Sequence, residues 1–321
     1  MNASDRTRQQ PTQAQDQAQS HPAAEASVAA SQHPSDPHRR WFGLAAAAAC
    51  TGLAAPGWAQ QAPAGAKEFV IGVLPNVSAR ILLAAYQPMR THFERELKRP
   101  VVIATAANFK VFATNTLRGD YDMVVTAPNL GRVMQLDGGW DPLAIYEPRI
   151  PALAVSLAAN KDDSPQQVKG KAVAMANPQS LVALVAMQWL KAEGLEAGRD
   201  FKTVVTANDD SLGAVLNSGE APWAVMSMGE FRAKPEALRQ TLRIVRQITT
   251  VPGFYVMANP KLAADERARL KSLVLGFPPS EDGKRFFELS GFKNIRAMVS
   301  EDQTFLDPFN DVTRSSLGLK R

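Results

Sequence analysis

The chain has 321 residues and, with 36 basic against 31 acidic side chains, a formal net charge of +5. Its only cysteine and three of its four histidines fall within the first fifty residues, so from residue 60 on His92 is the one residue of either kind. This distribution excludes a disulfide framework, a thiolate nucleophile and a Cys/His zinc site in the body of the protein. His92 lies among helix-forming residues with no nucleophile elbow nearby, and we expect it on a helix surface rather than in a catalytic triad.

The first 59 residues have the features of an export signal. Residues 1–37 are rich in Gln, Ala, Ser, Pro and Asp without an apolar period, which predicts disorder. A basic pair, Arg39-Arg40, then precedes a short alanine-rich apolar stretch and small residues typical of a cleavage site. We therefore expect residues 1–59 to be a disordered region with a cleavable signal, and residues 60–67 to be a linker.

Two features of this signal leave alternatives open. Arg39-Arg40 with Phe42 resembles a twin-arginine signal, and general secretion fits as well. Residues 47–50 resemble a lipoprotein cleavage box, but Ala47 stands where leucine is expected. Cys50 is thus either a lipid anchor or, as we favour, part of the discarded signal. Every alternative predicts an exported, periplasmic protein.

Short apolar runs alternate with helical patterns along the rest of the chain. The predicted strands lie at 68–74, 100–104, 121–126, 151–158, 171–175, 202–206, 224–227, 242–248 and 251–258. The predicted helices lie at 88–97, 109–117, 181–193, 210–216, 259–275 and 280–289. Pro88 suits the first turn of its helix. The alternation predicts an α/β fold with mainly parallel sheets flanked by helices.

The pattern repeats, which predicts two lobes. Residues 117–126 and 216–227 each contain a helix end, a glycine turn, a strand and a hydroxyl residue at the strand's carboxyl end. We assign 68–155 and 252–307 to the first lobe, 156–251 to the second and 308–321 to a polar C-terminal tail. The strands at 242–248 and 251–258 would return the chain to the first lobe, so that it crosses between the lobes twice.

Polar loops lie where such a fold binds ligands. In open α/β sheets ligands bind beyond the carboxyl ends of the strands. There the sequence places hydroxyl and amide side chains at the heads of helices, whose free N–H groups attract anions. The candidate ligand-binding residues are Asn76, Ser78, Phe109, Thr126, Asn129, Gln179, Ser180, Asp209 and Ser227.

Most of these residues also have a purely structural interpretation. Three residues in these loops are of types that ordinarily cap helices: Ser78, Ser180 and Asp210. Phe109 either stacks on a ligand, which we favour, or fills the core. Asp209 either holds a ligand amine or is a solvated acid. The tryptophans that we expect in the core are Trp140, Trp189 and Trp223.

Four motifs in a fixed order connect the chain to a known family. They are residues 71–75 at the opening of the domain, 117–129 around the first glycine turn, 209–217 before the second, and Gly253-Phe254-Tyr255 at the return crossing. In this order they resemble the phosphonate-, phosphite- and phosphate-type periplasmic solute-binding proteins of ABC transporters, over about residues 68–297. The resemblance implies a type II periplasmic-binding-protein fold that closes on a small ligand. It also implies a separate membrane permease and ATPase as partners.

The ligand-facing turns depart from that family's pattern. Its phosphonate binders carry a Ser/Thr-rich turn with glycine at the head of the second-lobe helix, whereas here residues 177–183 contain a single hydroxyl, that of Ser180. The first-lobe strand likewise ends with one hydroxyl, that of Thr126. A phosphonate would lose several donors, so the ligand stays open among small oxyanions.

The sequence therefore predicts a monomeric periplasmic solute-binding component of an ABC-type transporter. It predicts a small-molecule anion as ligand and no catalytic residue, cofactor, metal or nucleic-acid partner. The alternative is a ligand-sensing periplasmic module that reports to a membrane receptor. An exported enzyme on the same scaffold is disfavoured because the chain has no phosphate-loop or metal motif. A DNA-binding regulator is disfavoured because no helix-turn-helix pattern precedes the domain.

Overall fold

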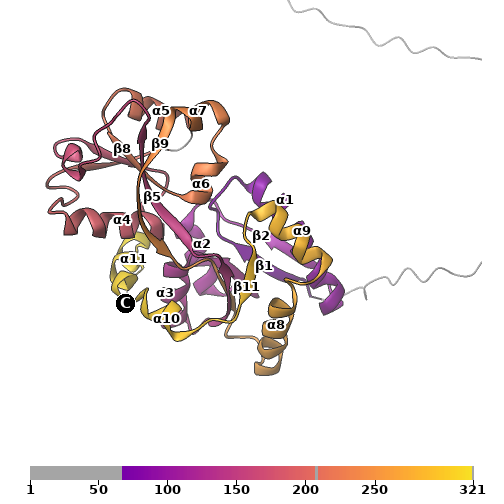
Figure 1. Ribbon diagram of the computed structural model, residues 1–321. Coiled ribbons are helices and arrows are strands. Elements are labelled where there is room, and N and C mark those ends of the chain that lie inside the picture. Colours follow the sequence, from indigo (N-terminus) through magenta and orange to yellow (C-terminus); the bar gives the residue numbers. More distant parts are fainter. Residues whose placement is uncertain (1–66, 207–208, 320–321) are drawn as a thin grey trace, which may run out of the picture. The chain divides into compact units, whose positions relative to one another are not determined.

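The computed structural model describes residues 67–206 and 209–319 as two sheets with flanking helices (Figure 1). The first sheet has the order β11-β4-β10-β3-β1-β2. Its strands are β1 (Phe69–Val73), β2 (Val101–Ala104), β3 (Met123–Thr126), β4 (Asp141–Glu147), β10 (Tyr255–Ala258) and β11 (Asn294–Arg296). The second sheet has the order β7-β6-β8-β5-β9. Its strands are β5 (Ile150–Leu157), β6 (Ala172–Met175), β7 (Lys202–Val205), β8 (Trp223–Ser227) and β9 (Leu242–Val251).

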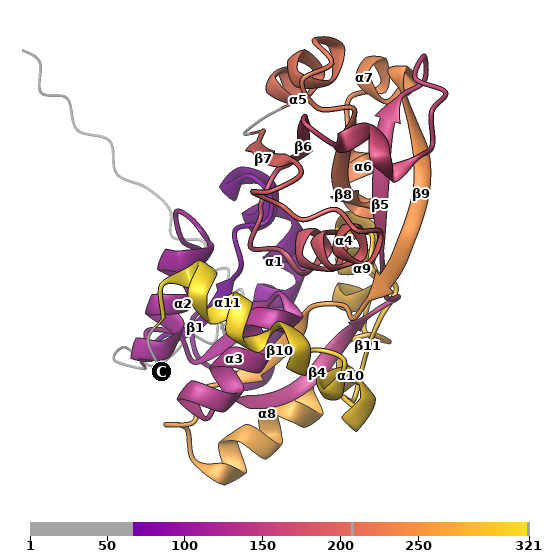
Figure 2. The ribbon, with the colours of Figure 1, turned by 90° about the vertical axis from the view of Figure 1, so that its left-hand side faces the viewer.

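Each sheet and its helices form one lobe (Figures 1 and 2). The first lobe contains α1 (Ala79–Leu97), α2 (Phe109–Arg118), α3 (Pro128–Gly138), α8 (Ala264–Gly276), α9 (Glu281–Ser290), α10 (Ser300–Thr304), η2 (Asp307–Phe309) and α11 (Asn310–Leu317). The second contains η1 (Pro165–Val168), α4 (Leu181–Ala192), α5 (Asp209–Asn217), α6 (Met228–Ala233) and α7 (Glu236–Thr241).

In each sheet three parallel strands form one side and antiparallel strands form the other. In the first, β1 pairs in parallel with β2 and β3, and in the second β6 pairs in parallel with β7 and β8. The strands β4, β10 and β11 of the first sheet, and β5 and β9 of the second, add antiparallel pairs. The sheets are therefore mixed, where the sequence predicts mainly parallel ones. The three parallel strands of each sheet still end at one common edge.

The chain passes between the sheets twice, after β4 and after β9. β9 pairs with β5 along its whole length, so it belongs to the second sheet and does not return the chain to the first, as the sequence suggests for 242–248. At the second passage Tyr146 donates its N–H to the carbonyl of Phe254 over 2.9 Å. A Cβ on Gly253 would lie 2.1 Å from the carbonyl oxygen of Tyr146, so this passage requires glycine. The lobe limits drawn from the sequence stay a prediction.

Several elements differ from their predicted form. Helix α1 begins at Ala79 and contains Pro88 in its interior, not in its first turn. Strands β4 and β11 have no counterpart among the predicted strands. The segment expected to be a polar tail forms η2 and α11, with Phe309 and Leu317 buried.

His92 is buried, which corrects the expectation of a surface residue. The residue is 7% exposed, and its ring packs against Phe93 and Phe277. A guanidinium nitrogen of Arg95 lies 2.9 Å from Nδ1, which must accept that hydrogen bond. Burial, followed by the charge of Arg95, lowers the pKa of His92. His92 is therefore a neutral core residue at neutral pH.

The tryptophans pack as expected, with Trp140 and Trp223 fully buried and Trp189 stacked on Trp223.

No helix within residues 67–206 and 209–319 is long and apolar enough to cross a membrane. The predicted export signal, Cys50 and the linker up to residue 66 lie outside the described residues.

Candidate functional site at the contact between the lobes

The polar turns predicted from the sequence follow the parallel strands of both sheets. In the first lobe β1, β2 and β3 lead into α1, α2 and α3, and in the second β6 leads into α4. Since parallel neighbours end at the same edge, these turns gather at one edge of each sheet. A hydrogen bond joins the two edges: the Asn129 side chain donates through Nδ2 to the carbonyl oxygen of Gln179 over 3.2 Å. The turns before α3 and α4 therefore meet.

The turn between β3 and α3 is buried and incompletely hydrogen-bonded. Thr126 is 0% and Asn129 1% exposed. Besides Gln179, the Asn129 amide nitrogen contacts the hydroxyl of Thr313 at 3.1 Å. Neither Thr126 Oγ1 nor Asn129 Oδ1 has a hydrogen-bond partner within the described residues. Buried polar atoms without partners are rare, and these two need partners that the described residues do not supply.

The turn between β6 and α4, by contrast, is closed by its own hydrogen bonds. Ser180 caps α4 by accepting the N–H of Ala183 over 3.1 Å. Asn177 accepts the N–H of Gln179 over 2.8 Å, and the Gln179 side chain donates to the carbonyl of Ser316 over 2.7 Å. The polar groups of this turn are therefore held in place by hydrogen bonds within the protein.

The C-terminal helix α11 takes part in both turns and lies between α3 and α4 in Figure 1. The Arg314 guanidinium binds both carboxylate oxygens of Asp137, at the end of α3, over 2.7 to 3.2 Å. Leu317 is buried in one apolar cluster with residues of both lobes, among them Leu130 and Leu181. Through these contacts α11 is fixed to the first lobe and reaches the second.

Thr313 and Ser316 are site residues that the sequence analysis missed. The signal available was the spacing of Phe309, Thr313 and Leu317, which places three buried side chains on one helical face. A threonine at the centre of that face weakens the apolar pattern.

The remaining predicted residues are placed differently. Phe109 is 5% exposed and belongs to the apolar cluster shared by the lobes. Asn76 and Ser78 are exposed, and Ser78 stands at the head of α1 without a capping side-chain bond. Ser227 forms a capping box with Glu230 at the head of α6. Asp209 opens α5, but its side chain lies outside the described residues, and Asp210 is exposed within the helix.

The ionisable groups near the two connections between the sheets form hydrogen bonds and ion pairs that stabilise the fold. Arg296 binds Asp302 over 2.7 and 2.9 Å and Glu147 over 3.0 Å, and Tyr255 donates its hydroxyl to the Asp302 carbonyl over 2.9 Å. Burial acts to raise the pKa of Asp302, but hydrogen bonds from Arg296 and from the Val299 N–H outweigh it and lower that pKa. Burial raises the pKa of Tyr255 far above its ordinary range. These groups are structural.

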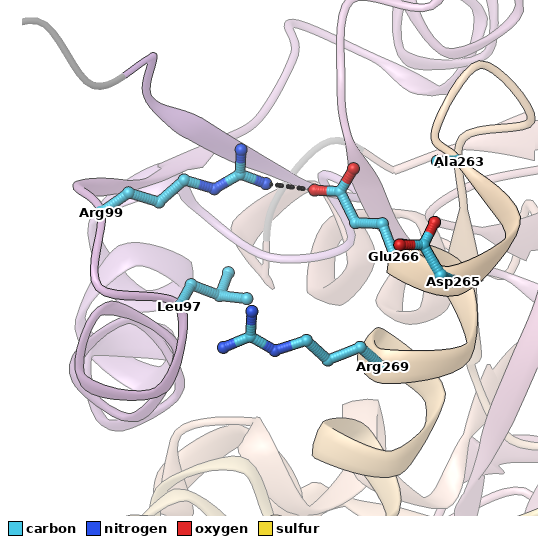
Figure 3. Close-up of a pocket in the computed structure, with 6 residues that line it drawn as sticks. All are labelled: Leu97, Arg99, Ala263, Asp265, Glu266 and Arg269. Carbon is cyan, nitrogen blue, oxygen red and sulfur yellow. Dashed lines mark hydrogen bonds and ion pairs between the residues drawn. The ribbon is translucent and has the colours of Figure 1, made fainter.

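A surface hollow of about 360 Å³ lies away from the carboxyl ends of the parallel strands, between α1 and α8 (Figure 3). It is lined by Leu97, Arg99, Ala263, Asp265, Glu266 and Arg269. Arg99 is paired with Glu266 at 2.7 Å, and Arg269 donates to the carbonyl of Glu96 over 2.7 Å. Because Leu97 ends α1 just before β2 begins, the hollow lies at the amino edge of the parallel strands. The part of the chain that the structure describes contains no cluster of three His, Cys, Asp or Glu residues suited to a metal ion.

A known protein family matches most of the chain. Residues 71–303 match the model of the family described as ABC transporter, phosphonate, periplasmic substrate-binding protein. No curated protein matches the chain.

Three solved structures illustrate the shared fold. A binding protein component of an ABC phosphonate transporter from Pseudomonas aeruginosa is 12% identical, with a TM-score of 0.66, over 78% of this chain and 88% of that one. PhnD1 from Prochlorococcus marinus, solved with methylphosphonate, is 15% identical, with a TM-score of 0.65, over 78% and 98%. The aliphatic sulphonate binding protein SsuA from Escherichia coli is 12% identical, with a TM-score of 0.59, over 79% and 94%.

Proposed function

The chain belongs to the family of periplasmic substrate-binding proteins of ABC phosphonate transporters, and we propose that it holds a small oxyanion between its two lobes. The observation that carries this proposal is the meeting of two helix heads. The turns before α3 and α4, helices of 11 and 12 residues, are joined by the hydrogen bond from Asn129 to Gln179. Helix N-termini favour negative charge, and two of them at one contact suit an anion.

The predicted residues divide into two groups in this proposal. The inner group is buried or half-buried around the joined turns and would contact the anion: Thr126, Asn129, Gln179 and Ser180. The outer group would contact a larger ligand or complete closure: Asn76, Ser78, Asp209 and Ser227. Phe109 supports the inner group from the core. Lobe closure on the ligand would follow from motion about the two passages.

The partners follow from the family. Substrate-binding proteins of ABC transporters work with a membrane permease and an ATPase, and we propose that this chain delivers its ligand to such a pair as a periplasmic monomer without enzymatic activity. Removal of the export signal and the absence of a lipid on Cys50 are part of the proposal. Mass determination of the protein recovered from the periplasm would test both.

Thermal unfolding with added anions tests the ligand class. Phosphate, phosphite, methylphosphonate, methanesulfonate and acetate would each be added to the chain from Gln60 on. A ligand at 100 times its dissociation constant should stabilise the fold by about 2.7 kcal/mol. The absence of a shift with every small anion would contradict the proposal. Chemical conversion of a bound anion would contradict the assignment as a binding protein.

A further inference from the structure

We propose that Asn129 accepts a hydrogen bond from a protonated oxygen of the ligand, so that the site selects a singly protonated phosphonate or phosphite over a sulfonate. We rest this on the proposed function, because it concerns the same interlobe site. The starting point is the unpartnered Oδ1 of Asn129, a residue that is 1% exposed at the contact between the lobes.

The orientation of the Asn129 amide is fixed by its neighbours. A backbone carbonyl only accepts hydrogen bonds, so the atom that lies 3.2 Å from the Gln179 oxygen must be the amide nitrogen. The same nitrogen has the Thr313 hydroxyl at 3.1 Å, and these two contacts use both of its hydrogens. Oδ1 is left as a buried acceptor. An acceptor of this kind is satisfied only by a donor, and an oxyanion provides one only where it carries a proton.

The rest of the turn offers donors for the charged oxygens. The hydroxyl of Thr126 is buried and lacks a partner among the described residues. Pro128 lies in the first turn of α3 and has no N–H to donate. The first hydrogen bond within the helix is donated by the Gly131 N–H to the carbonyl of Ala127 over 2.9 Å. The N–H groups of Asn129 and Leu130 are therefore at the free head of the helix. Donors for two oxygens beside one acceptor match a singly protonated phosphonate.

A sulfonate lacks the proton that this arrangement requires. Methylphosphonate and methanesulfonate are nearly the same size and, at mildly acidic pH, carry the same single negative charge. Only the phosphonate then has an O–H to donate. Charge and shape cannot separate the two anions under these conditions, so any preference reports the hydrogen bond to an acceptor.

The C-terminal helix holds the Asn129 side chain in place. Thr313 lies on α11, beyond residue 303, where the match to the family model ends. The ion pair between Arg314 and Asp137 holds α11 against α3, which keeps Thr313 beside Asn129. Thr313 is thus a positioning residue: it holds the amide nitrogen and leaves Oδ1 as the acceptor without a partner among the described residues.

Titration calorimetry with the two anions at one mildly acidic pH tests the proposal. The purified protein should bind methylphosphonate at least about tenfold more tightly than methanesulfonate. Asn129→Leu should remove this preference, and Thr313→Val should reduce it. Thr126→Val is the matched control: it removes a donor that both anions use, so it should weaken both and leave their ratio unchanged. The affinity ratio is insensitive to a partial loss of folded protein, which keeps the measurement valid for a destabilised variant.

The outcomes separate this inference from the proposed function. Equal binding of the two anions by the wild type, tighter binding of the sulfonate, or an unchanged ratio in Asn129→Leu would overturn the inference and leave an oxyanion-binding protein. If Asn129→Leu does not fold, an unchanged ratio in Thr313→Val overturns it. Failure of the wild type to bind any small anion would overturn the proposed function itself.

Discussion

The turn before α3 in the first lobe and the turn before α4 in the second meet in space but differ in how their polar groups are satisfied. In the second lobe Ser180 caps its helix, and both the backbone N–H and the side chain of Gln179 have partners. In the first lobe Thr126 and Asn129 each retain a buried polar atom without a partner in the described part of the chain. The second-lobe turn is hydrogen-bonded by the protein, whereas the first-lobe turn keeps two buried polar atoms for which the described residues supply no partner.

Under the proposed function, this difference predicts which turn recognises the ligand. A turn that is hydrogen-bonded internally contributes shape, whereas a turn with unsatisfied buried groups gains free energy only when a ligand supplies their partners. The resemblance to phosphonate binders leads one to look for the hydroxyl groups of the second-lobe turn. Here that turn has one hydroxyl, and Ser180 uses it as a cap. We infer that the first lobe, together with α11, carries most of the ligand specificity.

The largest expected effect tests whether the Phe109 ring contacts the ligand or fills the core. Phe109→Ala should lower the free energy of unfolding by about 3–5 kcal/mol, because the ring is 5% exposed within the cluster shared by the lobes. Denaturant unfolding without ligand measures the change. Val111→Ala, on the same helix at a position 40% exposed, is the control and should change stability by no more than about 0.5 kcal/mol. Weaker ligand binding with unchanged stability would instead assign Phe109 to the ligand.

The next effect concerns the completed turn. Ser180→Ala should destabilise the fold by about 1 kcal/mol, because the N–H of Ala183 loses its acceptor. Ser78→Ala is the matched variant: Ser78 occupies the same position before α1 but forms no capping side-chain bond, so its loss should change stability by less than about 0.5 kcal/mol. Thermal denaturation of both variants side by side measures the difference. Equal losses would show that the two serines do not differ as the structure indicates.

The incomplete turn should respond in the opposite direction. Thr126→Val keeps the shape of the side chain and removes a buried hydroxyl that has no protein partner, so the ligand-free fold should gain up to about 1 kcal/mol. Anion affinity should fall in the same variant. Denaturant unfolding and calorimetry on one preparation give both values. A loss of stability without ligand would mean that the hydroxyl already has a partner in the free protein.

Much of the fold could be predicted from the sequence, because buried parallel strands are short apolar runs that end at Gly, Pro or Asn. Strand β4 was not predicted because it begins with Asp141-Pro142, residues that are typical of turns. Strand β11 was not predicted because it has only three residues. The burial of His92 depends on packing against Phe277, far along the chain.

The site could be predicted only in part. Thr126, Asn129, Gln179 and Ser180 follow strand ends, which places them at the right edges of the sheets. Which of their atoms are satisfied could not be predicted, since this depends on partners from other parts of the chain. Thr313 is 184 residues from Asn129, and no local pattern links the two.

The smallest expected effect is the pH dependence of stability that His92 causes, and it serves as a reference for pH experiments on ligand binding. The pKa of His92 in the folded protein is lowered below its ordinary value of about 6.5. At a pH between the folded-state pKa and the unfolded-state pKa, the unfolded chain therefore binds more protons than the folded one. The contribution of His92 is complete above about pH 6.5, and it is lost progressively as the pH falls through the window below that value. Unfolding free energies measured from about pH 7.5 to pH 5 should show this loss in the wild type and a smaller one in His92→Gln.

The same variant separates the two sources of pH dependence. His92 packs between Phe93 and Phe277 beside Arg95 and Asp282, and the joined turns are not among these contacts. The preference for methylphosphonate over methanesulfonate should therefore change with pH in His92→Gln as it does in the wild type, because it follows the proton on the ligand. A preference that loses its pH dependence in this variant would place the titrating group in the protein and remove the reason for assigning proton recognition to Asn129.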